Sequence, residues 1–579
     1  MTLAPPPANA VADALRAATA DAVRQRVLAQ LVASLIAEDA LRAERDGTSY
    51  TVHGTAIYTF TAREHGFGRV RLHGPVLRDG EPARSPAQFL DEVGALLDAD
   101  ADRLPGFARE LEETVLKDAL GQYARPPGPI DPEAGHDALE ALAGDGHRYH
   151  PAYKSRLGFD VEDQFAYGPE FAPTVHPVWL AVDASIASVT PSATAPVGSD
   201  PAALWSAQLD GTGLVPPPGT VPIPVHPWQW RTVVARAFAP ELASGAIRVL
   251  GRDGHDYRPQ ASIRTLACLD APTLPSPKLS LSITNTSTAR GLAPYTVRNA
   301  ARISDWLAGL VADDPLLHDE ARVIVLREVL GVSVGEGAGP LERDREGALS
   351  VIWRESLHTH LEPGEHAVPF PGLAARSREG VPLIDPWIRK RGARTWVREL
   401  ADAAVVPLVH LLVRHGVALE SHAQNMLLVH IGGRPVRVAL KDFHDGVRFC
   451  RAELADPGVC PSLEAPPAHH GNANSFIETD DLDAVTGFLL DALCFVNLTD
   501  AAHLLEEQYG LAEEAFWVEV VSAIRAHAAR DGEFADGLAR FDVFAPTLEV
   551  EKLTSRRLHP DTGLRVRTVP NEWAVAGRA

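Results

Sequence analysis

The spacing of hydrophobic residues predicts helices at both ends of the chain and strands between them. From residue 9 to about residue 45, apolar positions recur every three or four residues, which is typical of one long amphipathic helix or two. Three strand-like runs and two more helical stretches follow, at 50–53, 56–61, 68–72, 89–97 and 107–123. Because the proline-rich segment 125–129 then interrupts the pattern, we predict a supporting α+β domain over residues 1–130.

The middle of the chain predicts a β-rich domain, residues 131–390, and the remainder a mostly helical one, residues 391–579. We expect an edge strand at 221–225, and two further strands at 262–269 and 278–284. From about residue 390 the spacing becomes helical, over 395–412, 482–505 and 513–529. The predicted fold class is therefore α+β, with an antiparallel sheet in the central domain.

One stretch of the last domain, residues 419–449, predicts a β-hairpin. Its sequence is LESHAQNMLLVHIGGRPVRVALKDFHDGVRF. Two apolar runs, 426–431 and 436–440, flank a four-residue connection that contains two glycines and a proline.

Polar side chains gather at the open end of this hairpin. A turn centred in the middle of the connection would place Asn425 opposite Asp442. Before the hairpin, Glu420, His422 and Gln424 alternate, so an extended strand would point all three to one face. A carboxylate that faces an amide oxygen is a suitable site for Mg²⁺, which prefers hard oxygen ligands. The alternative interpretation is a polar hairpin end exposed to water.

Residues 260–290 hold a second group of candidate functional side chains. A strand over 262–269 would place Ser262 and Arg264 on one face, and a neighbouring strand would start at Lys278. Because consecutive strands usually lie side by side, Arg264, Lys278 and Arg290 should meet in a region rich in hydroxyl groups. Phosphates and carboxylates are bound by this combination, since arginine offers two parallel donors and lysine a point charge. A sheet edge decorated with Lys and Thr to prevent aggregation is the alternative.

A third candidate is the segment 146–159, GHRYHPAYKSRLGF. His, Lys and Arg cluster there between glycine and proline residues, which suggests a loop that contacts anions. A solvated basic loop explains the same composition. The later segment HPWQW, residues 226–230, contains two tryptophans that are more typical of a core than of a site.

Composition narrows the function without naming it. The chain has 579 residues, of which 45% are hydrophobic and 22% charged, as in a soluble globular protein of several domains. The net charge of −22 argues against nucleic-acid binding, because nothing suggests a basic stripe. Four cysteines without a CxxC pair predict neither a disulfide framework nor a zinc or iron–sulfur site. We find no signal-peptide pattern and no apolar run long enough to span a membrane, and therefore expect a cytoplasmic protein.

The basic segment and the hairpin end would make complementary halves of a nucleotide site. The first would neutralise phosphates, and the second would hold Mg²⁺ and a co-substrate. Transfer of AMP or phosphate onto a carboxylate gives a mixed anhydride that an amine can attack, and a protein assists mainly by positioning and charge stabilisation. The motifs GxxxxGK[ST] and GxGxxG are absent, so the sequence predicts neither a P-loop nor a Rossmann protein.

Six motifs, in order along the chain, resemble the IucA/IucC family, the NRPS-independent siderophore synthetases. They are GHRYHPAYKSRLGF (146–159), HPWQW (226–230), SIRT (262–265), KLSLSITNTSTAR (278–290), ESHAQN (420–425) and KDF (441–443). One departure is Arg148, where the commoner GHPxHP form has proline. The resemblance implies a fold likened to a hand, with the three predicted domains as thumb, fingers and palm, and a homodimer.

The activity implied by the resemblance is ATP-dependent adenylation of a polycarboxylate, usually citrate, followed by amide or ester formation with an amine or alcohol. The motifs do not decide which acid is used: free citrate, a citrate monoamide, α-ketoglutarate or a succinylated hydroxamate. ATP and citrate together bring about seven negative charges into one cleft, which requires several fixed cations besides Mg²⁺.

The resemblance also implies a role for each motif residue. The ATP phosphates would be contacted by Ser262, Arg264, Thr265 and Lys278. The nucleotide and Mg²⁺ site would be completed by Gln424, Asn425 and Asp442, with Glu420 as a further metal ligand. The carboxylate substrate would be held by Thr286, Arg290 and His422, with His150, Lys154 and Arg156 lining the same cleft. The expected catalytic residues are thus Lys278, Thr286, Arg290 and His422, the last of which either orients the carboxylate or accepts the proton of the amine.

Two other functions compete with this interpretation. The pattern H-x-x-N, an apolar hairpin and then DF also resembles the Mg²⁺ site of aminoglycoside-phosphotransferase-like kinases, in which the base would be Glu420. Against a kinase, the N-terminal part has no glycine-rich loop followed by a strand lysine. The second is an iron–siderophore binding or reducing protein, but the spacing of Cys450, Cys460 and Cys494 does not provide an iron–sulfur site.

Overall fold

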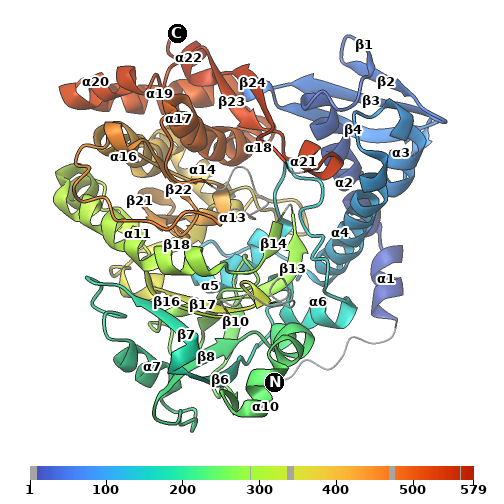
Figure 1. Cartoon of the computed structure of the whole chain (residues 1–579). Coiled ribbons are helices and arrows are strands. Elements are labelled where there is room, and N and C mark those ends of the chain that lie inside the picture. The colour runs from blue at the N-terminus through green and yellow to red at the C-terminus, as the bar shows by residue number, and fades with distance from the viewer. Residues whose placement is uncertain (1–8, 287, 336–344, 468–475, 561, 579) are drawn as a thin grey trace.

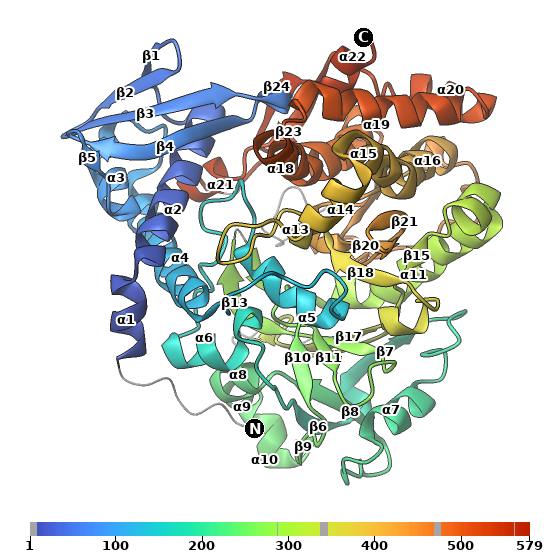
Figure 2. The same cartoon turned by 180° about the vertical axis from the view of Figure 1, so that it is seen from behind.

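Helices and strands are mixed throughout the chain, in agreement with the predicted α+β class. The structure, a computed structural model, describes residues 9–286, 288–335, 345–467, 476–560 and 562–578. The N-terminal, central and C-terminal parts of the chain occupy separate regions of the molecule (Figure 1 and Figure 2). Their division into thumb, fingers and palm remains a prediction.

The N-terminal region packs helices against a five-stranded antiparallel sheet. The long N-terminal helix is divided in two at Ala17, and Leu28 and Leu31 of its second part are buried in a core with Tyr58 and Phe89. The strands are β1 (Glu44–Asp46), β2 (Ser49–His53), β3 (Ile57–Glu64), β4 (Val70–Arg78) and β5 (Glu81–Pro82). The helices are α1 (Ala10–Arg16), α2 (Ala18–Ala37), α3 (Pro86–Val93) and α4 (Leu104–Ala124).

The central region contains two larger antiparallel sheets and two two-stranded ones, where a single antiparallel sheet was predicted. The first has the order β8-β6-β9 and the second β12-β17-β16-β7. The strands are β6 (Val178–Asp183), β8 (Thr220–Val225), β9 (Ile247–Arg252), β7 (Ala187–Pro191), β12 (Ser276–Leu279), β16 (Glu328–Val334) and β17 (Leu349–Arg354). Strand β8 lies at an edge, which confirms the prediction for 221–225 and suits its two prolines. Trp228 is buried, as expected of a core residue.

Two expected strands of the central region are shorter than predicted. Only β11 (Leu266–Cys268) of the segment 262–269 is extended, and it pairs with β10 (Tyr257–Pro259). Residues 261–264 form a turn in which Ile263 has a φ of 73°, so Ser262 and Arg264 do not share a strand face. The run 278–284 is divided at Ser280 between β12 and β13 (Leu281–Asn285), which pairs with β14 (Thr288–Arg290).

The C-terminal region combines the predicted helices with a sheet that crosses residue 390. This sheet has the order β15-β21-β20-β18, in which β15 (Ile324–Val325) and β18 (His366–Pro369) precede that residue and β20 (Met426–Ile431) and β21 (Arg434–Leu440) follow it. The domain boundaries remain predictions. The main helices are α11 (Pro294–Asp313), which packs on β16, and α14 (Asp385–Arg391), α15 (Ala393–Leu400), α16 (Val406–His415), α17 (Leu482–Leu490), α18 (Thr499–Tyr509), α19 (Glu513–Ala528) and α20 (Gly532–Arg540).

The hairpin is present, but its register differs by one residue from the prediction. The turn consists of Gly432 and Gly433 alone, with φ of 53° and 82°, because both positions need the left-handed backbone that glycine allows. An irregularity between Val429 and His430 then shifts the pairing. Asn425 therefore lies opposite Lys441, whose N–H donates to the Asn425 carbonyl at 3.0 Å, and not opposite Asp442.

The segment before the hairpin is also less extended than predicted. Strand β19 (Val417–Leu419) ends before Glu420 and pairs with β22 (Val447–Phe449). Residues Ala423–Asn425 form a single 3₁₀ turn. The expected alternation of Glu420, His422 and Gln424 along one strand is therefore wrong.

One long helical stretch corrects the expectation about apolar runs. By length and composition Leu482–Tyr509 could cross a membrane, but 61% of its most apolar window is buried inside the protein. Burial of this kind is typical of a core helix.

Candidate active site

A cavity of about 450 Å³ lies between the central and C-terminal regions. Its volume is in the range of small-molecule sites. Its wall is formed by parts of the segments 146–156, 261–290, 370–374, 420–425, 442–448, 483–501 and 549–566. Of the residues predicted from the sequence, those that line it are His150, Arg156, Ser262, Arg264, Lys278, Thr286, Arg290, Glu420, His422, Gln424, Asn425 and Asp442.

Three cations, Arg264, Lys278 and Arg290, which we call the basic cluster, meet on one side of this cavity. Thr265 and Lys278 form an isolated antiparallel β-bridge, which places the turn of residues 261–264 beside β12. Arg264 Nη1 donates to the Arg290 carbonyl at 2.7 Å. Ser262 Oγ donates to Thr265 Oγ1 at 2.8 Å, which fixes the turn. The sequence argument that these segments adjoin is confirmed, although the turn replaces the predicted strand.

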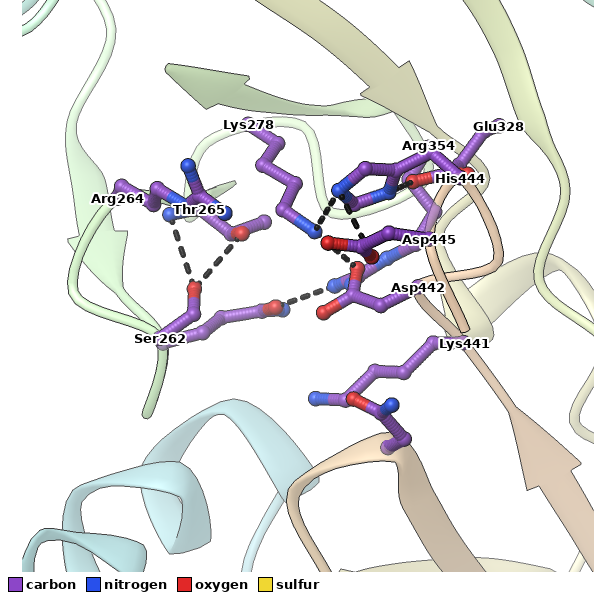
Figure 3. Close-up of polar contacts among 12 residues, drawn as sticks. Ser262, Arg264, Thr265, Lys278, Glu328, Arg354, Lys441, Asp442, His444 and Asp445 are labelled. Atoms are coloured by element: carbon purple, nitrogen blue, oxygen red, sulfur yellow. Dashed lines mark hydrogen bonds and ion pairs between the residues drawn. The ribbon is translucent and has the colours of Figure 1, made fainter. Parts of the chain in front are cut away.

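Asp442 is the anion at the centre of the basic cluster. Its Oδ1 lies 3.0 Å from Lys278 Nζ and 2.8 Å from Arg354 Nη1 (Figure 3). Burial alone would raise the pKa of Asp442, but Lys278 and Arg354 outweigh burial and hold this pKa well below its usual range. Burial, in contrast, lowers the pKa of Lys278. The carboxylate is therefore ionised at neutral pH and remains a ligand for cations.

His444, which the sequence argument missed, connects this cluster to the sheet. Its Nδ1 lies 2.7 Å from Oε1 of the fully buried Glu328. Its Nε2 lies 3.5 Å from Lys278 Nζ and 3.3 Å from Asp445 Oδ1 (Figure 3). His444 follows the KDF motif directly, so the signal was its position beside a recognised motif. The side chain of Lys441 in that motif does not line the cavity, because it is bound to Glu140 at 2.8 Å.

The residues expected to hold a carboxylate lie together. Arg290 Nη2 donates to Thr286 Oγ1 at 3.4 Å. Burial, assisted by Arg264, lowers the pKa of Arg290 to about 10, which leaves the guanidinium charged at neutral pH. Burial also lowers the pKa of His422 to about 4, so its imidazole is neutral and can accept a proton.

The oxygen ligands available for a metal ion are those of Asp442, Asn425 and Glu420. The Asn425 amide donates to the Glu420 carbonyl at 3.0 Å, which leaves its side-chain oxygen as an acceptor. Burial and the neighbouring carboxylates Asp445 and Glu551 together raise the pKa of Glu420 to about 8. A nearby cation would favour the ionised form of Glu420. This all-oxygen donor set fits Mg²⁺.

The 146–156 segment reaches the cavity only in part. His150 lines it, and its buried Nε2 has no hydrogen-bond partner among the described residues. Arg156 also lines it, but the guanidinium is bound to Glu170 at 2.9 Å. Lys154 does not line it: its Nζ is bound to the buried Asp118 at 2.6 Å. The predicted role of Lys154 in the cleft is therefore wrong, because its charge is already neutralised inside the protein.

Strained backbone is concentrated at this cavity. Arg156, Thr286 and Asp442 line it with φ of 37°, 58° and 65°, and Ile263 lies between the lining residues Ser262 and Arg264. Such left-handed conformations cost of order 1–3 kcal/mol each and occur preferentially at functional sites.

Four carboxylates, Glu420, Asp491, Glu549 and Glu551, line another part of the cavity, and we call them the acidic cluster. Glu549 and Glu551 alternate on β23 (Thr547–Glu551), which pairs with β24 (Val566–Pro570), and the Glu551 N–H donates to Asp491 Oδ2 at 3.0 Å. Burial raises the pKa of Asp491 to about 7. Sequence reasoning missed the last three residues, because a single acid in an apolar helix or a short strand gives no motif.

Comparison with known proteins supports one family. The profile of the IucA / IucC family matches residues 135–375, and that of the ferric iron reductase FhuF-like transporter family matches residues 394–566. In a solved crystal structure, the petrobactin biosynthesis protein AsbB of Bacillus anthracis, the fold is similar with a TM-score of 0.90, at 36% identity and 98% coverage of both chains.

Two relatives are similar over almost their whole length. A Staphylococcus aureus protein, named 2-[(L-alanin-3-ylcarbamoyl)methyl]-3-(2-aminoethylcarbamoyl)-2-hydroxypropanoate synthase, is 40% identical over 96% of this chain and 93% of its own. A Bacillus anthracis protein, named citryl-spermidine/3,4-dihydroxybenzoyl-citryl-spermidine:spermidine ligase, is 38% identical over 95% of this chain and 93% of its own.

Proposed function

Because this chain belongs to the IucA/IucC family of siderophore synthetases, we propose that it joins a carboxylate of citrate or a citrate derivative to an amine or alcohol. ATP activates the acid by adenylation, and AMP and pyrophosphate are released. The observation that carries this proposal is the basic cluster, which gathers Arg264, Lys278 and Arg290 around one cavity. Several fixed cations are what ATP and a polycarboxylate require when they share a site.

In the first step, a carboxylate oxygen attacks the α-phosphorus of ATP, and the bond from that phosphorus to pyrophosphate breaks. Lys278 and Arg264, with the hydroxyl group of Ser262, bind the phosphates. Thr265, predicted as a further contact, is buried outside the cavity lining and supports Ser262 instead. Fixed cations stabilise the charge that develops on the transferred group without reorganisation. Arg290 and Thr286 hold the other carboxylates of the substrate and orient the attacking one.

In the second step, the nitrogen of the amine attacks the acyl carbon, and the bond from that carbon to AMP breaks. His422 is neutral at physiological pH and lies beside Arg290, so it accepts the proton that the amine loses. Glu328 orients His444, which lies beside Lys278 and fixes the position of its ammonium group.

Magnesium would be held by Asp442 and Asn425, with Glu420 beside them. When bound, the ion neutralises phosphate charge and orients the nucleotide. Asp442 also lies between Lys278 and Arg354, whose charges keep it ionised and therefore able to bind the ion.

Product analysis tests the proposal. The protein is incubated with ATP, Mg²⁺, citrate and a panel of amines, and the nucleotides are separated. We expect AMP and pyrophosphate that depend on citrate, with heat-treated protein as the control. ADP would support the kinase alternative and contradict adenylation. The absence of any carboxylate-dependent AMP would also contradict adenylation.

The match of residues 394–566 to FhuF-like proteins gives the reductase alternative no specific support. The four cysteines are free, and Cys268, Cys450 and Cys494 are buried.

A further inference from the structure

A group of metal-ligand side chains lies outside the cavity, where several helices of the C-terminal region meet. It consists of Asp314, which follows α11, His410 and His415 in α16, His527 in the last turn of α19, and Asp531, which caps α20. None of the five is among the residues that line the cavity. Helices α11, α16 and α20 lie on the same side of the molecule in both views (Figure 1 and Figure 2).

Two imidazoles are directed at one oxygen atom of Asp314. Its Oδ2 lies 2.9 Å from His410 Nε2 and 2.8 Å from His415 Nε2. Burial would raise the pKa of Asp314, but the hydrogen bonds of His410 and His415 outweigh burial and hold this pKa well below its usual range. The group therefore presents one ionised carboxylate oxygen beside two imidazole nitrogens.

The atoms behind these three are also arranged as in a metal site. Asp314 Oδ1 accepts the Leu317 N–H at 3.0 Å, which fixes the carboxylate. His410 Nδ1 lies 3.2 Å from His527 Nε2. With a metal ion on Nε2, the proton of His410 is on Nδ1 and is donated to His527. Outer contacts of this kind orient the ligands of metal sites.

The charges around His527 are compatible with a cation. Burial, His410 and Arg530 lower the pKa of His527, so this imidazole is neutral and can accept a hydrogen bond. The charge of Arg530 is opposed there by Asp531 and Glu320.

The distances suit zinc after a small adjustment. Zinc binds imidazole nitrogen and carboxylate oxygen at about 2.0–2.1 Å, so tetrahedral ligands are about 3.3 Å apart. The two separations between Asp314 and the histidines must therefore widen by about half an ångström. The His415 side chain is 16% exposed, so the ion can enter and this side chain can move. Imidazole ligands favour zinc and similar ions, whereas magnesium prefers oxygen.

We propose that Asp314, His410 and His415 bind one Zn²⁺ ion, with the fourth position open to water on the exposed side of His415. This site is separate from the magnesium site proposed at Asp442, and it does not depend on the proposed function. Because the ion links the end of α11 to α16, its binding stabilises the folded protein.

The experiment measures zinc binding by tag-free protein that a chelator has freed of metal. Zn²⁺ is added together with excess Mg²⁺, which competes for the oxygen ligands at Asp442 but not for imidazoles. Bound zinc is counted by mass spectrometry after gel filtration, and its affinity is measured by calorimetry. We expect one zinc ion for each chain, and a higher melting temperature when zinc is bound.

Three variants locate the ion. His415→Gln removes a ligand at the end of α16, and it should abolish both the stoichiometric binding and the rise in melting temperature. His527→Leu keeps all three ligands and should weaken zinc binding about 10–100-fold, as for loss of an outer contact. The matched control is His53→Gln, which removes an exposed imidazole on β2 and should bind zinc as the wild type does.

Absence of bound zinc in the wild type would overturn the inference and leave Asp314, His410 and His415 as a hydrogen-bonded triad. Circular dichroism establishes that each variant is folded. Zinc that binds equally to the wild type and to His415→Gln, or to His527→Leu if His415→Gln does not fold, would place the ion elsewhere and would also overturn the inference.

Discussion

Two groups of basic residues, both predicted from the sequence to line the cleft, lie in different environments in the structure. Lys154 and Arg156 are bound to Asp118 and Glu170, and Lys154 is 2% exposed and does not line the cavity. Arg264, Lys278 and Arg290 all line the cavity. Lys278 is paired with Asp442, as Lys154 is with Asp118, but Asp442 is shared with Arg354 and lines the cavity, so the basic cluster keeps positive charge that a ligand can reach.

The two groups therefore have different effects on the protein. The Lys154–Asp118 pair joins helix α4 of the N-terminal region to the loop that enters the central region. It contributes to stability. The basic cluster concentrates like charge, which is unfavourable for folding and favourable for binding an anion.

The largest effect expected is on stability, from Lys154→Met. This change leaves the fully buried Asp118 without its closest cation, and breaking a buried pair costs about 3–5 kcal/mol. Urea unfolding measures the loss, and the exposed Lys390→Met is the matched control. An increase in the KM for citrate or ATP, with no loss of stability, would show that Lys154 does bind substrate in the cleft.

Lys278→Met should lower activity and leave stability almost unchanged. We expect kcat/KM to fall about 10²–10³-fold, since one group that stabilises transition-state charge is removed. The free energy of unfolding should change little, because Arg354 still binds Asp442. Steady-state kinetics and urea unfolding of the same preparation test both parts. A stability loss as large as that of Lys154→Met would contradict the comparison.

Arg290→Ala separates the two anions within the basic cluster. We expect the KM for the carboxylate to rise about 10–100-fold, as for loss of a charge-assisted contact, while the KM for ATP remains nearly unchanged. Initial rates with each substrate varied in turn provide the measurement. An equal rise in the KM values for both substrates would contradict the role assigned to Arg290.

The smallest effect is the contribution of Asp118 to acid stability. Burial raises the pKa of Asp118, but Lys154 and Arg26 outweigh it and lower this pKa from 3.8 to about 2. A lowered pKa stabilises the folded protein above the ordinary value, and this contribution, about 2 kcal/mol, is lost as the pH falls from about 4 to 2. Unfolding measured across this range should show the loss in the wild type and not in Asp118→Asn. The same slope in both proteins would assign the acid sensitivity to other groups.

Local patterns predicted most of the elements and the positions of the motifs. The helical spacing of 395–412 and 513–529 was sufficient. Residues 406–413 of the first segment are all buried, and the helix of the second buries one side. Arg264, Lys278 and Arg290 were found because they lie close in sequence and on consecutive segments.

Features that depend on distant partners could not be predicted in this way. Asp118, the partner of Lys154, lies 36 residues away on a helix with no site motif. The hairpin register changed because the turn used two residues and the strand contained an irregularity. Asp491 and Glu551 are brought together by packing of a helix against a strand.

The central claim, that the basic cluster transfers AMP to a carboxylate, is tested most directly with citrate labelled with ¹⁸O in its carboxyl groups. The carboxylate oxygen that attacks phosphorus leaves with the nucleotide when the amine displaces it. We predict one ¹⁸O atom in each AMP released, detected by mass spectrometry. Unlabelled AMP, or ¹⁸O found in inorganic phosphate together with ADP, would contradict the account.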